Sequence, residues 1–309
     1  MGPIIITGGA GIVGRHAVAA LIAMGHEVHV LTRALSRRQP PETGGAHFHA
    51  CDLRDHTATD AVLCDIRPEV LVHFAWTTAH GKFWSDPANA DWRDASKAMV
   101  GAFIRLGGRR VVGAGTCAEY DWRAPALADG LCDEADTPLT PHTPYGAAKH
   151  QFHDWLSRQD VESAWGRLFF LYGAGEDPAR FVPYVIRSLL GGAPALCASG
   201  RAVRDVMDTR DAGRAFALLA TGSFRGPLNV ASGEGHALAD IARLIAARLE
   251  RPDLVRLGAR PDRPDDPPRL VADVARLRGE VGFTPTITLQ QGIDDAIAGW
   301  RTAIENGED

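Results

Sequence analysis

The sequence predicts an α/β fold in which a parallel β-sheet carries helices on both faces. Short apolar runs alternate with helical patterns through the first half of the 309-residue chain, which is the order of β-α-β units. The runs are almost continuously apolar, as in strands that are buried on both sides. Hydrophobic residues make up 45% and charged residues 23% of the chain, which excludes a disordered, collagen-like or coiled-coil protein.

The apolar runs and helical patterns locate the expected elements. Strands are expected near 3–7, 27–32, 69–75, 109–114 and 163–169. Helices are expected near 12–25, 56–66, 88–107 and 144–158, and later near 179–190, 211–221, 237–249 and 288–304.

Glycine and proline become frequent after about residue 170, and the alternation weakens there. This change predicts a first domain over 1–169, to which 204–231 returns, and a second domain from 170–203 and 232–309. The proline-rich segment 258–268 resumes into an apolar run, so we expect an ordered loop rather than a flexible linker.

Charge and cysteine usage exclude several classes of protein. The formal net charge is −5, so no general basic field attracts nucleic acid. No apolar run approaches the roughly 20 residues that span a membrane, and Met1-Gly2-Pro3 leads into an apolar run too short for a secretory signal. The five cysteines are odd in number and scattered, which favours reduced thiols and a cytoplasmic location.

Three glycines mark the turn between the first strand and the first helix. Gly8, Gly11 and Gly14 fall three residues apart, with Ile12 and Val13 between the last two. Glycine permits the tight turn, the approach of a pyrophosphate to the backbone and close packing of helix on sheet. The free N–H groups at the helix N-terminus favour an anion, so the turn predicts dinucleotide binding.

The spacing G-x-x-G-x-x-G resembles the extended, sugar-nucleotide-modifying branch of the short-chain dehydrogenase/reductase superfamily. The resemblance spans about residues 3–300. It implies a Rossmann-type doubly wound sheet and a smaller C-terminal α/β domain that binds a nucleotide-diphosphate sugar. The crevice between them would hold both ligands.

The end of the second strand bears on the choice of nicotinamide cofactor. It reads Val30-Leu31-Thr32-Arg33 and lacks the carboxylate that usually holds the 2′-hydroxyl of NAD. Arg33 could pair with a 2′-phosphate, and Arg37 and Arg38 follow, although solvated arginines are common in loops. We therefore expect NADP(H) to be favoured over NAD(H).

The resemblance adds further residues to the expected cofactor site. It places Asp52 and Leu53 at the adenine, and the segment Phe74-Ala75-Trp76 beside the cofactor. Trp76 stands where relatives have a small residue, and Trp84 and Trp92 follow it. These aromatic side chains could cover the nicotinamide or a sugar face, or simply belong to the core. Phe169 completes the expected set.

Tyr145 and Lys149 are the expected catalytic pair. They are four residues apart and so share one face of a helix. An ammonium beside a phenol lowers the pKa of the phenol and makes it a usable general acid or base. The resemblance adds Thr116, four residues before Tyr120, to orient the substrate oxygen.

The residues after Thr116 depart from one branch of the resembling family. Sugar-nucleotide 4,6-dehydratases have Asp and Glu where this chain has Cys117 and Ala118, so water elimination lacks its acid and base. Cys117 either lines the substrate pocket or is a buried inert thiol. No metal site is expected, because His150 and His153 belong to no metal-ligand motif.

The second half of the chain supplies the expected substrate contacts. Arg204 opens a stretch that resembles the family's R-D-x-x-x-x-x-D, and a guanidinium suits a diphosphate. Arg263 and Asp266 resemble a second clamp, with the Asp on a ribose, and structural ion pairs are the alternative for both clamps. Phe170 replaces the Asn that usually faces the diphosphate.

Together these residues predict NADP(H)-dependent reduction of a nucleotide-diphosphate 4-keto-6-deoxy-sugar at C4. The expected substrate site comprises Trp76, Thr116, Cys117, Tyr145, Arg204, Arg263 and Asp266. A nucleotide-sugar 4-epimerase would use the same catalytic residues, and a non-catalytic NADP(H)-sensing protein is an alternative from another class. The resemblance also implies a homodimer, paired through the helices near 88–107 and 144–158.

Overall fold

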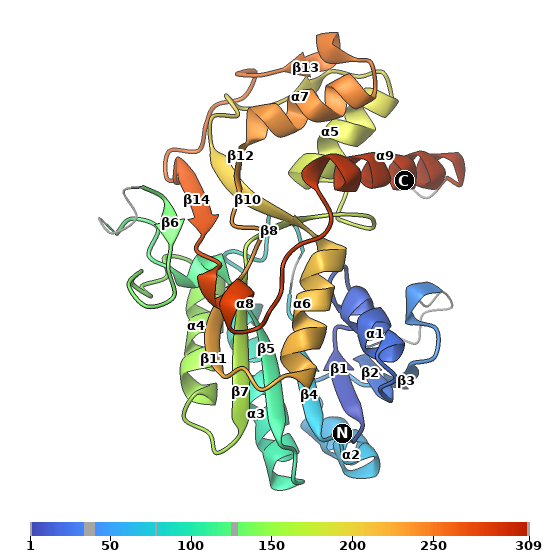
Figure 1. The fold of residues 1–309 in the computed structure, drawn as a ribbon, viewed down its shortest axis with the longest axis vertical. Coiled ribbons are helices and arrows are strands. Elements are labelled where there is room, and N and C mark those ends of the chain that lie inside the picture. The colour runs from blue at the N-terminus through green and yellow to red at the C-terminus, as the bar shows by residue number, and fades with distance from the viewer. Residues whose placement is uncertain (1, 34–40, 78, 125–128, 308–309) are drawn as a thin grey trace.

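The fold contains two main β-sheets of different size (Figure 1). We call each sheet, together with the helices packed on it, a layer. The computed structural model describes residues 2–33, 41–77, 79–124 and 129–307. The sheet of the larger layer is parallel and has seven strands. Its strands, in spatial order, are β11 (Gly226–Val230), β7 (Glu162–Leu168), β5 (Arg110–Thr116), β4 (Val70–His73), β1 (Ile4–Thr7), β2 (Val28–Thr32) and β3 (His47–Ala50).

Helices cover both faces of this sheet (Figure 1). One face packs on α1 (Gly14–Ala23) and α6 (Thr209–Thr221), whose alanine-rich surfaces allow close contact. The other face packs on α2 (His56–Ile66), α3 (Ala88–Arg105) and α4 (Pro144–Leu156). Their core-facing side chains recur at helical spacing, and β1, β4 and β5 are buried along their whole length. The predicted doubly wound fold is confirmed.

The smaller layer holds the remaining strands and three long helices. Its main sheet contains β12 (Gly235–Ala237), β10 (Val203–Asp208), β14 (Arg269–Ala272), β6 (Leu131–Cys132) and β8 (Phe170–Tyr172). A separate pair joins β9 (Ala195–Leu196) to β13 (Val255–Arg256). The helices α5 (Phe181–Leu190), α7 (Leu238–Arg248) and α9 (Leu289–Glu305) share an apolar core, and the short α8 (Ala275–Gly279) packs near β11. The described residues include the 3₁₀ turns η1 (Pro41–Thr43), η2 (Cys117–Glu119) and η4 (Pro252–Leu254).

The expected helices and the five expected strands are all present, but β3 and β11 of the large sheet and the strands of the smaller layer were not predicted. The sequence of β3, His47-Phe48-His49-Ala50, is not an apolar run, because β3 is an edge strand and only partly buried. Within the segment 204–231, α6 and β11 return to the large sheet, whereas β10 pairs with strands of the smaller layer. The division of the chain into two domains stays a prediction.

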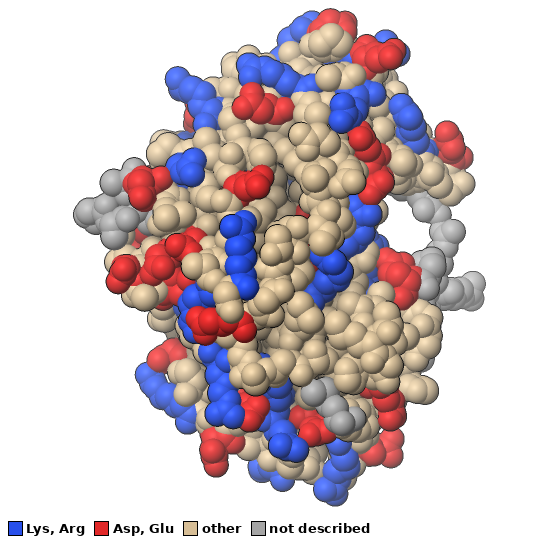
Figure 2. All heavy atoms as spheres, in the orientation of Figure 1, with Lys and Arg blue, Asp and Glu red and all other residues tan. Residues whose placement is uncertain are grey.

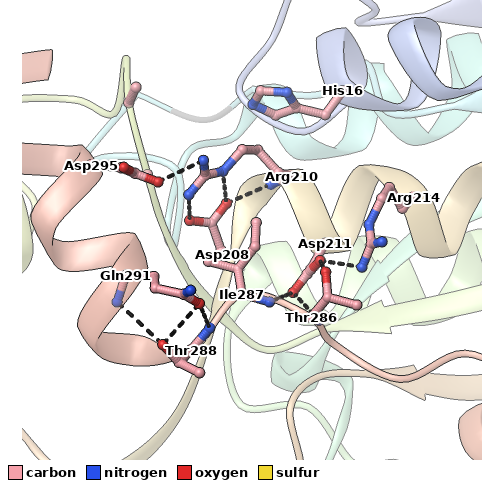
Figure 3. Close-up of polar contacts among 12 residues, drawn as sticks. His16, Asp208, Arg210, Asp211, Arg214, Thr286, Ile287, Thr288, Gln291 and Asp295 are labelled. Atoms are coloured by element: carbon pink, nitrogen blue, oxygen red, sulfur yellow. Dashed lines mark hydrogen bonds and ion pairs between the residues drawn. The ribbon is translucent and has the colours of Figure 1, made fainter.

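The two layers are joined by polar contacts around the start of α6 (Figure 3). The buried carboxylate of Asp211 accepts hydrogen bonds from the backbone N–H groups of Thr286 and Ile287, at 2.9 and 3.0 Å. Arg210 pairs with Asp208, the N-cap of α6, and with Asp295 on α9, each at 2.8 Å. The last Asp of the R-D-x-x-x-x-x-D stretch therefore anchors the segment that leads into α9.

The visible surface carries no single dominant charge. Basic and acidic side chains are interspersed over the face in Figure 2. No helix in the described part of the chain is long and apolar enough to cross a bilayer. All five cysteines are free, and Cys64 alone among them is exposed.

Candidate active site

The glycine turn between β1 and α1 has the geometry that the sequence predicts for a pyrophosphate site. Gly8 has a φ of 69°, and a Cβ there would lie 2.8 Å from the backbone nitrogen of Ala75. Gly11 donates its N–H to the Gly8 carbonyl at 2.9 Å, and Gly14 packs directly against Gly8. The turn also contains Ile12 and Val13, and it delivers the N-terminus of α1 to the carboxyl edge of the sheet. These residues fit a bound dinucleotide.

The carboxyl ends of β2 and β3 supply the expected adenosine side of the site. Arg33 follows β2 directly and is exposed, whereas Arg37 and Arg38 lie outside the described residues. Asp52 follows β3, and Leu53 beside it is buried. The Arg54 guanidinium binds the Asp52 carboxylate at 2.6 Å and lowers its pKa to about 2, with Arg33 contributing a smaller effect in the same direction. Asp52 is therefore ionised at neutral pH.

Thr116, Tyr145 and Lys149 meet where β5 ends and α4 begins. Thr143 caps α4 by accepting a hydrogen bond from the Gly146 N–H at 3.0 Å, and Pro144 occupies the first helical position. Tyr145 therefore lies in the first turn of α4, beside the last residue of β5. The Thr116 hydroxyl accepts a hydrogen bond from the Ala118 N–H at 3.2 Å and lies close enough to the Tyr145 phenol to affect its pKa. The structure thus assembles the expected catalytic set.

One expectation about this set is wrong. The sequence predicts that Lys149 lowers the pKa of Tyr145, but in the structure the pKa of this phenol is raised above its usual range by burial. The nearby Thr116 side chain has the largest opposing effect on this pKa, and the positive charge of Arg180 opposes burial more weakly. Lys149 points elsewhere, toward the sheet.

Lys149 is buried, and its ammonium has two partners. Nζ donates a hydrogen bond to the Ala114 carbonyl at 2.8 Å and lies 4.0 Å from the centroid of the Trp76 ring. Burial lowers the pKa of Lys149 to about 7, and the negative charge of Glu119 opposes this shift. The lysine can therefore gain or lose its charge near neutral pH.

The other aromatic residues divide between site and core. Trp76 is buried and donates its indole N–H to the Asn89 side chain at 2.8 Å. Ala75 and Phe74 follow β4 beside the glycine turn, and Phe169 follows β7 at the same edge of the sheet. Trp92 is a residue of α3 whose buried side chain belongs to the core between the sheet and the helices, so it does not cover the site.

Glu119 is a central residue of the site that the sequence reading missed. Its fully buried carboxylate accepts hydrogen bonds from the Thr116 N–H at 2.8 Å, from the Trp165 indole at 3.0 Å and from Arg167 Nε at 3.1 Å. Thr116-x-x-Glu119 is the sequence pattern of a capping box, and the structure forms one there. That pattern could have revealed Glu119.

Glu119 also belongs to a group with two histidines of α4. Ligand atoms of Glu119, His150 and His153 lie within 4.8 Å of one another. The carboxylate already binds the Arg167 guanidinium, so a cation would have to compete with an arginine in a buried site. His153 stacks on Trp165 at 5.1 Å. We assign this group a structural role.

The expected substrate residues lie on the side of the smaller layer. Arg204 is buried, pairs with Asp266 at 2.7 Å and places its guanidinium 5.4 Å from the Phe170 ring centroid. Phe170 therefore supports Arg204 instead of offering a polar group. Arg263 is exposed, and its carbonyl accepts a hydrogen bond from the Asp266 N–H at 3.2 Å. The structure joins Arg204 to Asp266 but leaves the Arg263 side chain in solvent.

Cys117 and Arg180 complete the surroundings of Tyr145. Burial raises the pKa of the Cys117 thiol to about 12, so the thiol is not a nucleophile at neutral pH. Arg204 and Arg180 both act electrostatically here, Arg204 on Cys117 and Arg180 on Tyr145. Arg180 is the N-cap residue of α5, and no motif in the sequence singled it out.

The comparisons with known proteins identify the family. The family model described as NAD dependent epimerase/dehydratase family matches residues 4–231. The chain belongs to this family. Its members are enzymes that act on nucleotide sugars, so this chain is an NAD(P)-dependent enzyme of that class.

Individual relatives match over nearly the whole chain. A UDP-glucose 4-epimerase of Azospirillum brasilense is 25% identical, over 98% of this chain and 92% of its own. The structure of UDP-glucose 4-epimerase from Thermus thermophilus in complex with NAD is 25% identical with a TM-score of 0.83, over 97% of this chain and 99% of its own. An NAD-dependent NDP-hexosamine 5,6-dehydratase of tunicamycin biosynthesis is 26% identical with a TM-score of 0.83, over 98% of each chain.

Proposed function

We propose that this enzyme transfers a hydride at C4 of the hexose of a nucleotide-diphosphate sugar, with 4-epimerisation as its net reaction. The observation that carries the proposal is the position of Tyr145 in the first turn of α4, close to Thr116 at the end of β5 and at the same edge of the sheet as a glycine turn that fits a dinucleotide. The similarity to UDP-glucose 4-epimerases over most of the chain supports epimerisation.

Each residue of the set has a defined task. Tyr145 exchanges a proton with the C4 oxygen: the neutral phenol, which burial favours, donates it when the ketone is reduced, and the phenolate takes it back when the alcohol is oxidised. Thr116 donates a hydrogen bond to the same oxygen and fixes its position beside the phenol. Lys149 lies one helical turn from Tyr145 and would hold the nicotinamide ribose. The nicotinamide, when bound, supplies or accepts the hydride. Arg204 would bind the diphosphate of the sugar nucleotide.

A second candidate is the reduction of a 4-keto-6-deoxy-sugar with NADPH. The observation that favours it is the end of β2, where Thr32 and the exposed Arg33 stand in place of a carboxylate. Arg33 is free to pair with a 2′-phosphate. The solved relative named above contains NAD, which favours the epimerase.

The nucleotide that the purified enzyme carries separates these candidates. We would release any bound nucleotide for mass identification and titrate the protein with NADPH and NADH. Tightly held NAD, together with interconversion of UDP-glucose and UDP-galactose without added cofactor, is the result expected for the epimerase. Exchangeable NADPH with weak NADH binding, and no interconversion, would overturn it in favour of the reductase.

The variant Y145F tests the catalytic assignment itself. Loss of a positioned acid/base group should lower turnover by about 10²- to 10⁴-fold, while cofactor binding stays unchanged. Full turnover in Y145F would contradict the role of Tyr145. Absence of turnover with every nucleotide sugar, in a protein that binds cofactor, would favour the sensing protein instead.

We also propose a cytoplasmic homodimer that pairs through exposed faces of α3 and α4. These two helices pack side by side on one face of the sheet, which leaves their outer surfaces adjacent. A dimeric mass by light scattering at micromolar concentration is expected, and a monomeric mass would refute the pairing.

A further inference from the structure

Three histidines lie together at the edge of the large sheet that β2 and β3 form (Figure 1). His47 and His49 alternate along β3, so their side chains point to the same face of the sheet. The register pairs His29 on β2 with His47, which places His29 on that face as well. Leu31, two residues after His29, belongs to the core on the side of α2. The three histidines, which we call the histidine cluster, therefore lie on the α2 side of this edge.

Two ring nitrogens of the histidine cluster face each other at close range. The ring centroid of His29 lies 5.0 Å from that of His47 and 5.1 Å from that of His49. Nδ1 of His29 lies 2.9 Å from Nε2 of His49. One proton joins these two nitrogens in a hydrogen bond. A cation in place of that proton would receive a lone pair from each ring.

The carboxylate of Glu27 determines which nitrogen of His29 faces the cluster with its lone pair. Glu27 Oε1 lies 2.9 Å from His29 Nε2. A carboxylate only accepts hydrogen bonds, so Nε2 of the neutral ring carries the proton and Nδ1 presents its lone pair to His49. Histidines that bind metal ions almost always donate their other N–H to a carboxylate, a carbonyl or water in this way. His29 therefore already has the outer partner of a metal ligand.

The charge and exposure of this edge also favour a cation. Glu27 is exposed, and the carboxylate of Asp65 on α2 acts electrostatically on His49. Two carboxylates therefore attract a cation to a group of neutral nitrogen donors. His47 is exposed, whereas His29 and His49 are partly buried. An ion can thus enter from solvent and be held by the two inner rings.

Imidazole donors determine the chemical class of the ion. Zn²⁺, Ni²⁺ and Cu²⁺ favour imidazole nitrogen, whereas Mg²⁺ and Ca²⁺ favour oxygen. Zinc–nitrogen bonds are about 2.0–2.1 Å long, so two nitrogens bound to one ion lie about 2.9–3.4 Å apart. The distance of 2.9 Å between His29 Nδ1 and His49 Nε2 is at the short end of this range. A small rotation of both rings therefore directs the two lone pairs at one ion.

We propose that the histidine cluster binds one divalent ion of the zinc, nickel or copper class, which holds the edge strand β3 to β2. His29 Nδ1 and His49 Nε2 are the main ligands, the exposed His47 ring is a third, and water fills the remaining positions. The site does not depend on the proposed hydride transfer. It was not expected from the sequence, in which His29 and His49 are 20 positions apart. Because β3 leads into Asp52, the ion would also hold the strand that ends at the adenosine side of the cofactor site.

Titration with metal ions tests the proposal. We would use the full chain without an affinity tag, treated with a chelator, and carrying C64S so that the exposed thiol cannot bind the ion. Calorimetry with Zn²⁺ and with Ni²⁺ should show saturable binding of one ion per chain, and Mg²⁺ should not bind. E27A should lower the affinity by about 10-fold, and H29Q and H49Q by at least as much. Absence of saturable binding of both Zn²⁺ and Ni²⁺ would overturn the proposal.

H236Q is the matched control for these variants. His236 on β12 has a carboxylate two positions before it, Glu234, as His29 has Glu27, but its Nε2 lies 3.9 Å from that carboxylate. H236Q should leave the affinity for the ion unchanged. An equal loss of affinity in H236Q and H29Q would overturn the assignment.

H150Q tests the other group of possible ligands. Loss of binding in H150Q, with binding kept in H29Q and H49Q, would assign the ion to the group around Glu119 and overturn the proposal. Thermal unfolding without metal identifies a variant that fails to fold, in which case the other histidine variant of the cluster decides.

Hydrogen exchange locates the effect of the ion in the fold. Amides of β3 should exchange more slowly when Zn²⁺ is bound, because the ion ties this edge strand to β2. The slowing should be absent in H49Q. Unchanged exchange along β3 in a protein that binds Zn²⁺ would show that the ion does not hold the two strands together.

Discussion

The ammonium of Lys149 lies 4.0 Å from the centroid of the Trp76 ring, in a site where it also donates a hydrogen bond to the Ala114 carbonyl. The ring is fixed in turn by the hydrogen bond of its indole to Asn89. Trp76 therefore holds the lysine in place from the end of β4. The sequence predicts that Trp76 covers the cofactor or the sugar. Because Lys149 contacts one face of the ring, only the rest of the ring is available to a ligand.

Replacing Trp76 should weaken binding of the nicotinamide cofactor, because Lys149 would lose the partner that orients it. A desolvated cation–π contact is worth up to about 2 kcal/mol, so W76L should raise the cofactor dissociation constant by up to about 30-fold. W76F keeps an aromatic face and should raise it less. Fluorescence titration measures both variants, and an unchanged constant in W76L would show that Trp76 does not orient the lysine.

Glu119 and Arg167 form a fully buried ion pair whose Nε–Oε2 distance is 3.1 Å. Removing one charge of such a pair costs about 3–5 kcal/mol, because the other charge stays buried. E119Q should therefore lower the midpoint of thermal unfolding by roughly 5 °C or more. D154N breaks the exposed pair of Asp154 with Arg158 and serves as control, with a change near zero.

The double variant E119Q/R167M gives the second half of this test. It removes both charges, so most of the lost stability should return. A double variant that is as unstable as E119Q would show that hydrogen bonding to Thr116 and Trp165, rather than charge pairing, dominates.

The pKa of Lys149, lowered by burial from 10.5 to about 7, predicts a specific dependence of stability on pH. As pH falls from about 10.5 to about 7, the unfolded chain binds a proton at this lysine that the folded chain does not. The free energy of unfolding therefore decreases over this window and levels off below about pH 7. K149M lacks this contribution.

Thermal unfolding of the wild-type protein and K149M between pH 6.5 and 9.5 isolates the effect. The difference in midpoint between the two proteins should change steadily with pH above about 7. Tyr and Cys residues titrate equally in both proteins and cancel. A constant difference over the whole range would show that the lysine keeps an ordinary pKa.

Arg204 should bind the diphosphate of the substrate. A charge-assisted hydrogen bond contributes about 1.5–3 kcal/mol, so R204Q should raise the dissociation constant of the nucleoside diphosphate by about 10- to 100-fold. Cofactor binding should stay unchanged. R201Q is the matched control, because Arg201 precedes the same strand and its side chain is 86% exposed. Equal effects of both variants on calorimetric binding would remove Arg204 from the site.

The sequence by itself determined five strands of the large sheet, the glycine turn, and the placement of Tyr145 and Lys149 on one helix. These are local features: Gly8 needs its left-handed backbone, the apolar strands need burial on both faces, and Tyr145 and Lys149 share a face because of helical spacing. β3 was not predicted from the sequence, because this edge strand with alternating histidines lacks the apolar run of a buried strand.

Only the tertiary structure decided what surrounds those residues. Lys149 meets Trp76 across a separation of 73 positions, Arg204 meets Asp266 across 62, and segments 83–84 and 122 meet beside Tyr145. Burial in this region raises the pKa of Tyr145, whereas the sequence predicts that the pKa is lowered. Contacts between distant segments, and the burial they create, depend on how the layers pack, and no spacing in the sequence encodes that packing.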